Sequence, residues 1–461
     1  MRTEIEAIPF APGCRPLLGH AVAFMNDPVA FLSSMSSGPP LRRIRLGALD
    51  AVLVCDAELT WKVLLDDRTF DKGGPFYERS REVAGNGLGT CRHDQHRRQR
   101  RLCQPAFRAN HLAGYAELMA TSIEKTLQSW NGTRVIDLVT EMSGLTVDIS
   151  VRTMFSTSLP EPVVQRAARD VRVIAEGLFR RTVLPPLLNR IPTPTNLRFA
   201  RSRQRIRALA AQMIDRRRSS RARPGDLLSA LIGAHDNFSP SAVRLSDEEL
   251  VDQIFTFFLA GVETTASTLT WALYALSCDR NAAGKVEAEV DRVLAGPTAT
   301  LDDLAQLPAI TRVLTETLRL YPPGWLLTRE ASATTELASV SIPIGTTVAI
   351  SPHILHRRSE LFPDPELFDP DRWIGTIPAR NAYIAFGAGA RRCIGDQFAL
   401  VAASLALATI TRRWTLSPTA DRRLSVSLQN LPAPRTLPMQ IRPRRKLEGT
   451  ARTDAPESDR Q

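Results

Sequence analysis

Cys393 lies alone in a stretch rich in glycine and arginine that leads directly into a largely apolar run. Residues 386–395 read FGAGARRCIG, and the apolar run covers residues 397–410. Glycines permit tight turns that point backbone amides at the sulfur, and nearby cations or a helix N-terminus lower the pKa of a thiol. A merely buried cysteine is the alternative at this point. The pattern favours a thiolate, and we expect the rest of the fold to be organised around this sulfur.

A long helix is predicted from about Asp247 to Ser277, and it has a weak point in its middle. Gly261 lies there, and a glycine inside a helix costs about 1 kcal/mol relative to alanine. The Thr264 hydroxyl can reach the carbonyl of Ala260, four residues back, which bends a helix and opens a groove. Without further context, a buried helix with a tolerated glycine explains the pattern equally well.

Charged residues form patterns in two other places. Residues 92–101 are rich in arginine and place His96 and Arg100 four apart, on one helical face. Such a stretch is usually a solvated helix face. Glu316 and Arg319 form an i, i+3 pair, which by itself contributes only a few tenths of a kcal/mol.

Taken together, these stretches resemble the cytochromes P-450. Residues 386–395 match the haem-ligand motif Phe-x-x-Gly-x-Arg-x-Cys-x-Gly at every specified position, and residues 260–264 match the oxygen-activation motif Ala-Gly-x-(Asp/Glu)-Thr. Residues 96–100 match His-x-x-x-Arg. The Glu-x-x-Arg and Pro-x-Arg-(Phe/Trp) motifs of the family core match residues 316–319 and 370–373. The motifs stand in family order, and the resemblance covers about residues 9–440.

The resemblance implies a role for each matched residue. Cys393 would be the axial thiolate ligand of haem iron, which pushes electron density toward O–O cleavage. Glu263 and Thr264 would relay protons to the distal oxygen. Haem propionates that are partly out of water need cationic partners, and these would be His96, Arg100, Arg329 and Arg391. The haem pocket would also contain Phe386, Gly395, Ala260 and Gly261. The structural core network would contain Glu316, Arg319 and Arg372.

The expected fold is the mainly α cytochrome P-450 fold with a small β-rich lobe. We expect one domain over residues 1–445 and a disordered tail over 446–461. Strands are predicted at 41–46, 51–55, 340–350 and 424–431. Helical periodicity covers 112–221 with a proline-rich break at 184–194, and the two helices that flank the break would form a lid. The loop at 69–75 is expected to introduce a mobile segment over the active site.

Charge and cysteine usage exclude several classes of protein. The net charge of +11 comes from arginines at 97–101, 216–223 and 442–446, without interleaved aromatic residues, so we expect no nucleic-acid ligand. The six cysteines form no C-x-x-C pair, which argues against disulfides and structural metals. Residues 1–32 contain neither the ~18 apolar residues of a membrane span nor a signal-peptide pattern. We therefore expect a cytoplasmic monomer without a membrane span.

The resemblance implies monooxygenation, in which one atom of O2 enters a C–H bond and the other leaves as water, with haem b as cofactor. The predicted substrate pocket is nearly uncharged and suits a hydrocarbon; it contains Phe76, Phe257, Ala260, Trp325 and Leu326. Residues 96–101 with 105–107, and residues 188–199, resemble bacterial terpene hydroxylases of this family. We therefore favour a sesquiterpene, with a fatty acid or a macrolide-type molecule as the second choice.

A haem-thiolate protein that only binds a ligand, or that isomerises a peroxide without external electrons, is the alternative class. Neither activity needs a proton relay, so the acid–alcohol pair at 263–264 argues against both. The chain has no flavin-type Gly-x-Gly-x-x-Gly after a strand and no clustered cysteines for an iron–sulfur centre. Electrons should therefore come from ferredoxin and ferredoxin reductase. The acidic ferredoxin would dock over the Cys393 side, on Arg97, Arg98, Arg101 and Arg392.

Overall fold

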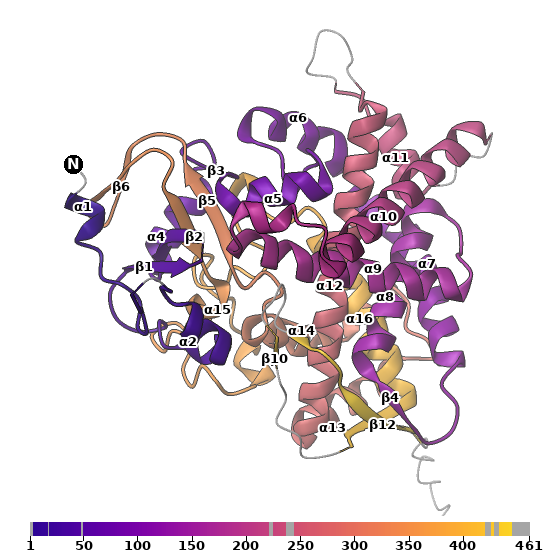
Figure 1. The fold of residues 1–461 in the computed structure, drawn as a ribbon. Helices are drawn as coiled ribbons and strands as arrows, with labels where there is room; N and C mark the ends of the chain where they lie inside the picture. Colours follow the sequence, from indigo (N-terminus) through magenta and orange to yellow (C-terminus); the bar gives the residue numbers. More distant parts are fainter. Residues whose placement is uncertain are drawn as a thin grey trace, which may run out of the picture.

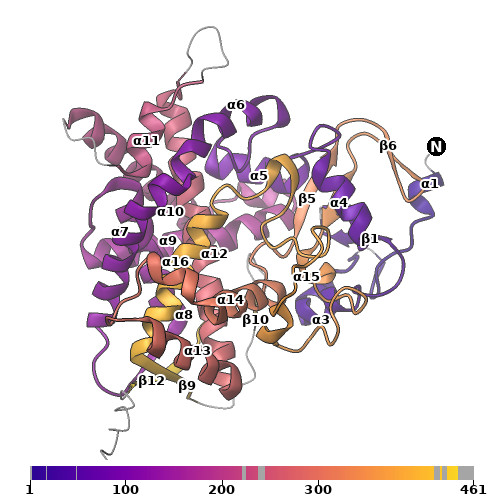
Figure 2. The same cartoon turned by 180° about the vertical axis from the view of Figure 1, so that it is seen from behind.

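The computed structural model describes residues 3–444, except for 17, 48, 221–224, 237–243, 420–425 and 428–432. A small lobe built on a mixed β-sheet lies beside a larger lobe of helices (Figures 1 and 2). This is the mainly α architecture with a small β-rich lobe that the sequence predicts. The predicted tail at 446–461 lies outside the described residues, as does most of the strand predicted at 424–431.

The β-rich lobe is organised by a five-stranded sheet with the strand order β1-β2-β8-β5-β3. Its strands are β1 (Leu41–Leu46), β2 (Leu49–Val54), β3 (Phe70–Asp71), β5 (Leu327–Ala331) and β8 (Thr347–Ile350). The β1–β2 pair is an antiparallel hairpin, whereas β2 and β8 run parallel and place Val52 opposite Val348. Apolar side chains of both strands are buried, because helices and loops cover the sheet.

Smaller elements complete this lobe and the edges of the molecule. The short helices are α1 (Thr3–Glu6), α2 (Ala21–Asn26), α3 (Pro28–Ser33), α4 (Ala57–Leu65) and α15 (Pro352–Leu355). The minor strands are β4 (Arg134–Asp137), β6 (Thr335–Leu337), β7 (Val340–Ile342), β9 (Trp414–Pro418), β10 (Val426–Ser427), β11 (Ala433–Pro434) and β12 (Pro438–Pro443).

The helical lobe surrounds α12 (Asp247–Cys278), which passes through its middle (Figures 1 and 2). Its other helices are α5 (Gly74–Ala84), α6 (His93–Cys103), α7 (Ala109–Gln128), α8 (Leu138–Phe155), α9 (Glu161–Val183), α10 (Pro194–Ser219), α11 (Leu227–Gly233), α13 (Arg280–Val293), α14 (Pro308–Leu320) and α16 (Asp396–Arg413). The α12 helix begins with a capping box between Ser246 and Glu249, which satisfies amides at its N-terminus. It packs against α8, α9, α10 and α16.

Several local predictions need correction. The loop predicted at 69–75 is shorter than expected, because β3 occupies Phe70–Asp71 and α5 already begins at Gly74, with Pro75 in its first turn, where proline fits a helix. The single strand predicted at 340–350 is divided by the turn at 343–346 into β7 and β8. The sequence pattern also missed β4, a four-residue strand between two long helices. The proline break is placed correctly, since α9 ends at Val183 and α10 begins at Pro194.

The carboxylate of Glu316 is fully buried and organises the loop that joins α14 to the Cys393 segment. Both its oxygens accept from Arg319 at 2.9 Å, and Arg372 Nε donates to it at 3.0 Å. The amide of Asp369 and the Trp373 indole also donate, each at 3.0 Å. The structure thus brings together the three residues that the sequence assigns to a structural network.

Within the part of the chain described, none of the helices has the length and apolar character needed to cross a bilayer.

Glu316→Gln should lower the free energy of unfolding by about 3–5 kcal/mol, because it leaves buried guanidinium groups without their counter-charge. Equilibrium unfolding in urea measures the effect. The control Glu117→Gln, on the exposed side of α7, should leave the midpoint unchanged. Equal midpoints for Glu316→Gln and the unmodified protein would contradict a structural role.

Candidate active site

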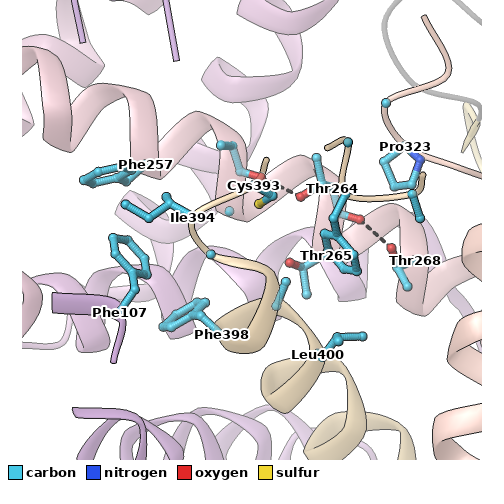
Figure 3. A pocket seen from close by; sticks show the side chains of 18 of the residues that line it. Phe107, Phe257, Thr264, Thr265, Thr268, Pro323, Cys393, Ile394, Phe398 and Leu400 are labelled. Carbon is cyan, nitrogen blue, oxygen red and sulfur yellow. Dashed lines mark hydrogen bonds between the residues drawn. The ribbon is translucent and has the colours of Figure 1, made fainter. Parts of the chain in front are cut away.

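A cavity of about 420 Å³ lies between the middle of α12 and the loop that carries Cys393. Figure 3 shows Cys393 and Ile394 on that loop, Thr264 and Thr265 on α12, and aromatic side chains around them. Phe107, Phe257 and Phe398 supply much of the lining. The lining is mostly apolar, so the cavity suits a largely hydrophobic group or a hydrocarbon.

The loop turns sharply before it presents Cys393 to the cavity. Gly387 and Gly389 have φ angles of +67° and +64°, which L side chains rarely adopt. A Cβ atom on Gly389 would lie 2.3 Å from the carbonyl oxygen of Leu64, so only glycine fits against α4. The amide of Cys393 then donates to the carbonyl of Phe386 at 2.9 Å and closes the turn.

The surroundings of the Cys393 sulfur act on its pKa in opposite directions. Burial raises the pKa of the Cys393 thiol, and the carboxylate of Asp396 acts in the same direction. A hydrogen bond from the Gly395 amide and the charges of Arg100 and Arg392 lower it. Burial is the largest effect, so the pKa of the free thiol stays raised, and the donors and cations at the N-terminal end of α16 offset it only in part. They would favour the thiolate once the sulfur binds a metal ion.

On α12, the Thr264 hydroxyl donates to the carbonyl of Ala260 at 2.5 Å, as the sequence predicts (Figure 3). Thr268 donates in turn to the carbonyl of Thr264 at 2.9 Å. The helix nevertheless continues without interruption from Asp247 to Cys278. Ala260, Gly261 and Thr264 all line the cavity, so the small residues give the cavity access to the helix backbone.

Glu263 is adjacent to Thr264 in the chain but does not line this cavity. Its carboxylate interacts with Arg172 and Glu176 of α9. Burial raises the pKa of Glu263 to about 7, and Glu176 adds to the shift while Arg172 opposes it. A carboxyl group with this pKa can both release and accept a proton near neutral pH.

Cationic side chains converge at another part of the cavity. Lys72, Arg329 and Arg391 line it, and their charges interact. Arg391 donates to the carboxylate of Asp71 at 2.8 Å. The other two donate only to backbone carbonyls: the Lys72 ammonium to that of Gly89 at 2.7 Å, and Arg329 to that of Thr328 at 2.8 Å. Among the residues described, no carboxylate forms an ion pair with Lys72 or Arg329.

His96 lies next to these cations, although it does not line the cavity. It is 2% exposed, its Nδ1 has no hydrogen-bond partner, and burial with the charges of Arg391 and Lys72 lowers its pKa to about 3. Buried cations without counter-ions and an unpartnered ring nitrogen call for an anionic ligand. A flat apolar group with two carboxylates, as haem is, fits both the lining and these charges.

The sequence did not identify Lys72 as part of this region. A lone lysine before a Gly-Gly-Pro turn gives no signal of burial, and only the fold brings it next to Arg329 and Arg391. Burial and those two charges lower the pKa of Lys72 to about 7. Arg100, predicted to bind a propionate, donates instead to the carbonyl of Arg392 at 2.5 Å and does not line the cavity.

The predicted substrate pocket is only partly reproduced in this cavity. Phe257, Ala260 and the haem-pocket residues Phe386 and Gly395 line it. The other three predicted residues do not. Phe76 packs edge-on against Tyr77, which lines the cavity in its place. Trp325 stacks on Phe24 in the core of the β-rich lobe, and Leu326 packs against the same cluster, because the chain after Pro323 turns toward the sheet.

Comparison with known proteins agrees with this geometry. The family model for Cytochrome P450 matches residues 9–438. The chain belongs to the cytochrome P450 family. It is therefore an oxidoreductase, and the family implies a haem-thiolate centre, for which Cys393 is the candidate ligand.

Three bacterial proteins are similar to the chain over most of its length. Pentalenene oxygenase of Streptomyces avermitilis is 42% identical over 436 residues, which is 94% of this chain and 96% of that protein. Cyclooctat-9-en-7-ol 5-monooxygenase of Streptomyces melanosporofaciens is 40% identical over 438 residues, or 94% of this chain and 95% of that protein. Cyclooctatin synthase of the same organism is 41% identical over 413 residues, or 88% and 90%.

Glu263→Gln should change how stability depends on pH. A folded-state pKa of about 7, above the ordinary value of 4.5, means that the unmodified protein loses stability as pH rises through this interval. The loss is at most about 1.4 kcal/mol per pH unit. In thermal unfolding, the midpoint of Glu263→Gln should therefore equal that of the unmodified protein near pH 5 and lie above it at pH 8. The control Glu248→Gln, in the exposed first turn of α12, should show no such pH-dependent difference. Parallel stability curves for Glu263→Gln and the unmodified protein would contradict the raised pKa.

Proposed function

We propose that this P450 is a monooxygenase that uses haem b, held by the Cys393 thiolate, to insert one atom of O2 into a C–H bond of a terpene. The observation that carries the proposal is a single apolar cavity lined both by Cys393 and by the Thr264 region of α12. A ligand-binding protein would need the cavity, but it would not need an alcohol next to an acid with a pKa of about 7.

The terpene class rests on the relatives. Their names state that one oxidises pentalenene and another oxidises cyclooctat-9-en-7-ol, and both align with nearly the whole of this chain. The lining of the cavity is consistent with such substrates, because Phe257, Pro323 and Leu327 offer no charge. We infer that a hydrocarbon, with a sesquiterpene as first choice, binds here by excluding water rather than by ion pairing.

The residues of the chain would hold the cofactor at both its iron and its carboxylates. Cys393 would ligate iron, while Lys72, Arg329, Arg391 and His96 would bind the propionates by charge and hydrogen bonds. When bound, haem supplies the activation of O2 and the transfer of an oxygen atom to carbon. Phe107 and Phe398 line the cavity and would help to exclude water from the bound cofactor.

The proton path is proposed from α12. The Thr264 hydroxyl lines the cavity, and its hydrogen bond to the Ala260 carbonyl engages its own proton while holding Oγ1 in place. In the relay, Oγ1 would therefore accept a proton through a lone pair as the hydroxyl releases its own. Glu263, on the side of the helix toward α9, would replenish that proton. Since its pKa is about 7, it can exchange protons with water at neutral pH without a large free-energy cost.

Cys393→His should abolish the red-shifted absorption band that reduced haem-thiolate protein gives with carbon monoxide, because the thiolate causes the shift. The band is measured as a difference spectrum. Cys278→Ser, at the exposed C-terminal residue of α12, is the control and should keep it. An unchanged band in Cys393→His would rule out the proposed ligand.

Thr264→Ala should uncouple electron use from product formation, because the proton donor is lost while the cavity keeps its shape. NAD(P)H consumption should continue, product should fall about tenfold or more, and hydrogen peroxide should rise. Thr270→Ala removes the same type of hydrogen bond, to Ala266 at 2.8 Å, outside the cavity and should remain coupled. Product per electron at the unmodified level in Thr264→Ala would exclude the relay.

The electron donor is proposed to be a ferredoxin that docks over the Cys393 loop. Two of the arginines predicted to form its binding face have structural partners instead: Arg98 pairs with Glu249 at 2.5 Å, and Arg101 with Asp236 at 2.8 Å. Reversing either charge would disturb the start of α12 or the segment that follows α11. Arg392 pairs with Asp396 at 2.7 Å but is 57% exposed. Arg97 is exposed, and no ion pair involves it within the described part of the chain.

Arg97→Glu should slow reduction by an acidic ferredoxin severalfold at low salt, and the difference should shrink as salt rises, because electrostatic steering is screened over about 10 Å at 0.1 M. Stopped-flow reduction measures the rate. The matched control is Arg216→Glu, at an exposed position on α10. Equal slowing by both variants, or a rate that does not depend on salt, would contradict docking on α6.

A further inference from the structure

Large apolar side chains are exposed close together where α9 connects to α10. Leu187 is 74% exposed, Leu188 45%, Ile191 49% and Leu197 41%. Asn196 fixes their arrangement, since its amide donates to the carbonyls of Leu188 at 3.1 Å and Ile191 at 2.8 Å. A group of exposed apolar side chains on a fixed backbone marks an interaction surface more often than a single exposed leucine does.

Arginines surround these apolar side chains. A hollow of about 410 Å³ is lined by Pro194, Leu197, Arg198, Arg201 and Arg205. A neighbouring hollow of about 440 Å³ shares Arg198 and Arg205 and adds Arg166 and Arg169 from α9. Hence the apolar and cationic side chains form one continuous surface. The name α9–α10 surface is used below for Leu187, Leu188, Ile191, Leu197, Arg166, Arg169, Arg190, Arg198 and Arg201.

Most of this positive charge has no carboxylate partner in the described part of the chain. Arg205 pairs with the buried Asp170 through Nε at 2.7 Å. Among the described residues, no ion pair involves the five arginines of the α9–α10 surface. Of the exposed carboxylates on α9, Glu161 interacts with Lys125 at 3.6 Å, and Glu176 lies by Arg172 and Glu263. The surface therefore has room and charge for an external anion.

We propose that the α9–α10 surface docks on an anionic lipid bilayer, with the leucines and Ile191 in the interfacial region and the arginines on lipid phosphates. Amphipathic surfaces of this kind bind in the plane of the interface and reversibly, without spanning the membrane. Arginine suits this role because its planar guanidinium binds phosphate through two parallel hydrogen bonds. Each arginine near the surface adds to the attraction, which salt screens.

The exposed apolar side chains decide in favour of a bilayer over a free anion. Inorganic phosphate would use Arg198 and Arg201 but would leave Leu187 and Ile191 in water. A bilayer receives both kinds of side chain at once. An acidic protein would need an apolar patch of matching shape, whereas lipid adapts to the protrusion of Leu187.

Docking would place the membrane against α9 and α10, which lie side by side and both pack against α12, the helix whose middle lines the cavity (Figure 1). An apolar substrate dissolved in the bilayer would then be close to its enzyme; this consequence rests on the proposed function. Binding to vesicles can be measured without any turnover, so the docking surface and the proposed activity can fail independently.

Flotation of the purified full-length protein with vesicles tests the proposal. We expect binding to vesicles of phosphatidylglycerol and phosphatidylcholine at 50 mM salt, little binding to pure phosphatidylcholine, and loss of binding at 500 mM salt. Leu187→Asp with Ile191→Asp, and separately Arg198→Glu with Arg201→Glu, should each weaken binding by about tenfold or more. All four positions are exposed, so the variants should keep the thermal unfolding midpoint of the unmodified protein.

The matched control is Ile377→Asp with Arg380→Glu, at exposed positions in the segment that leads to the Cys393 loop, and it should bind as the unmodified protein does. Absence of binding to anionic vesicles would overturn the proposal. The proposal would also be overturned if the arginine variant lost vesicle binding while the Leu187 and Ile191 variant kept it, because that result indicates simple electrostatic adsorption. Calorimetric binding of inorganic diphosphate at micromolar concentration without vesicle binding would identify a free-anion site instead, and would also overturn it.

Discussion

The position of the Cys393 sulfur at the wall of an apolar cavity is the constraint on which the other features depend. The turn that presents it requires glycine at 389, because any side chain there would meet the backbone of α4. The following helix α16 places its N-terminus behind the sulfur, and Arg100 and Arg392 add positive charge. On the far side of this loop, the buried carboxylate of Glu316 ties α14 to the segment around Arg372. A thiolate can therefore be held at low conformational cost.

The cavity combines two environments that a single ligand must match. Around Cys393 and Phe257 it is apolar, so it favours a ligand that loses little by leaving water. Around Lys72 and Arg329 it contains buried cations for which the described residues supply no carboxylate partner. A hydrophobic ring system with carboxylates at one edge satisfies both environments at once. The same charges would then fix which edge of the cofactor faces the β-rich lobe.

Sequence reasoning succeeded where chemistry requires particular residues at particular spacings. The motif around Cys393 and the Thr264–Ala260 hydrogen bond are local, so their geometry follows from the chain itself. It failed where the fold brings together distant residues of ordinary appearance. Lys72 is buried only because α5 and β5 enclose its loop. Trp325 was expected in the pocket, but the chain turns after Pro323, and its ring packs on Phe24, some three hundred residues earlier. The ion pair between Arg101 and Asp236 could not be predicted either, because its two residues are distant in the chain.

The origin of the oxygen atom in the product tests the central claim most directly. The enzyme, with ferredoxin, ferredoxin reductase and NAD(P)H, would be supplied with a panel of sesquiterpene hydrocarbons under 18O2 in ordinary water, and in parallel under ordinary O2 in 18O-labelled water. Mass spectrometry of an oxidised product should show one labelled oxygen per hydroxyl in the first reaction and none in the second, with no product when the electron donor is left out. Oxygen that comes from water, or product that forms without electrons, would contradict a monooxygenase built on Cys393 and Thr264.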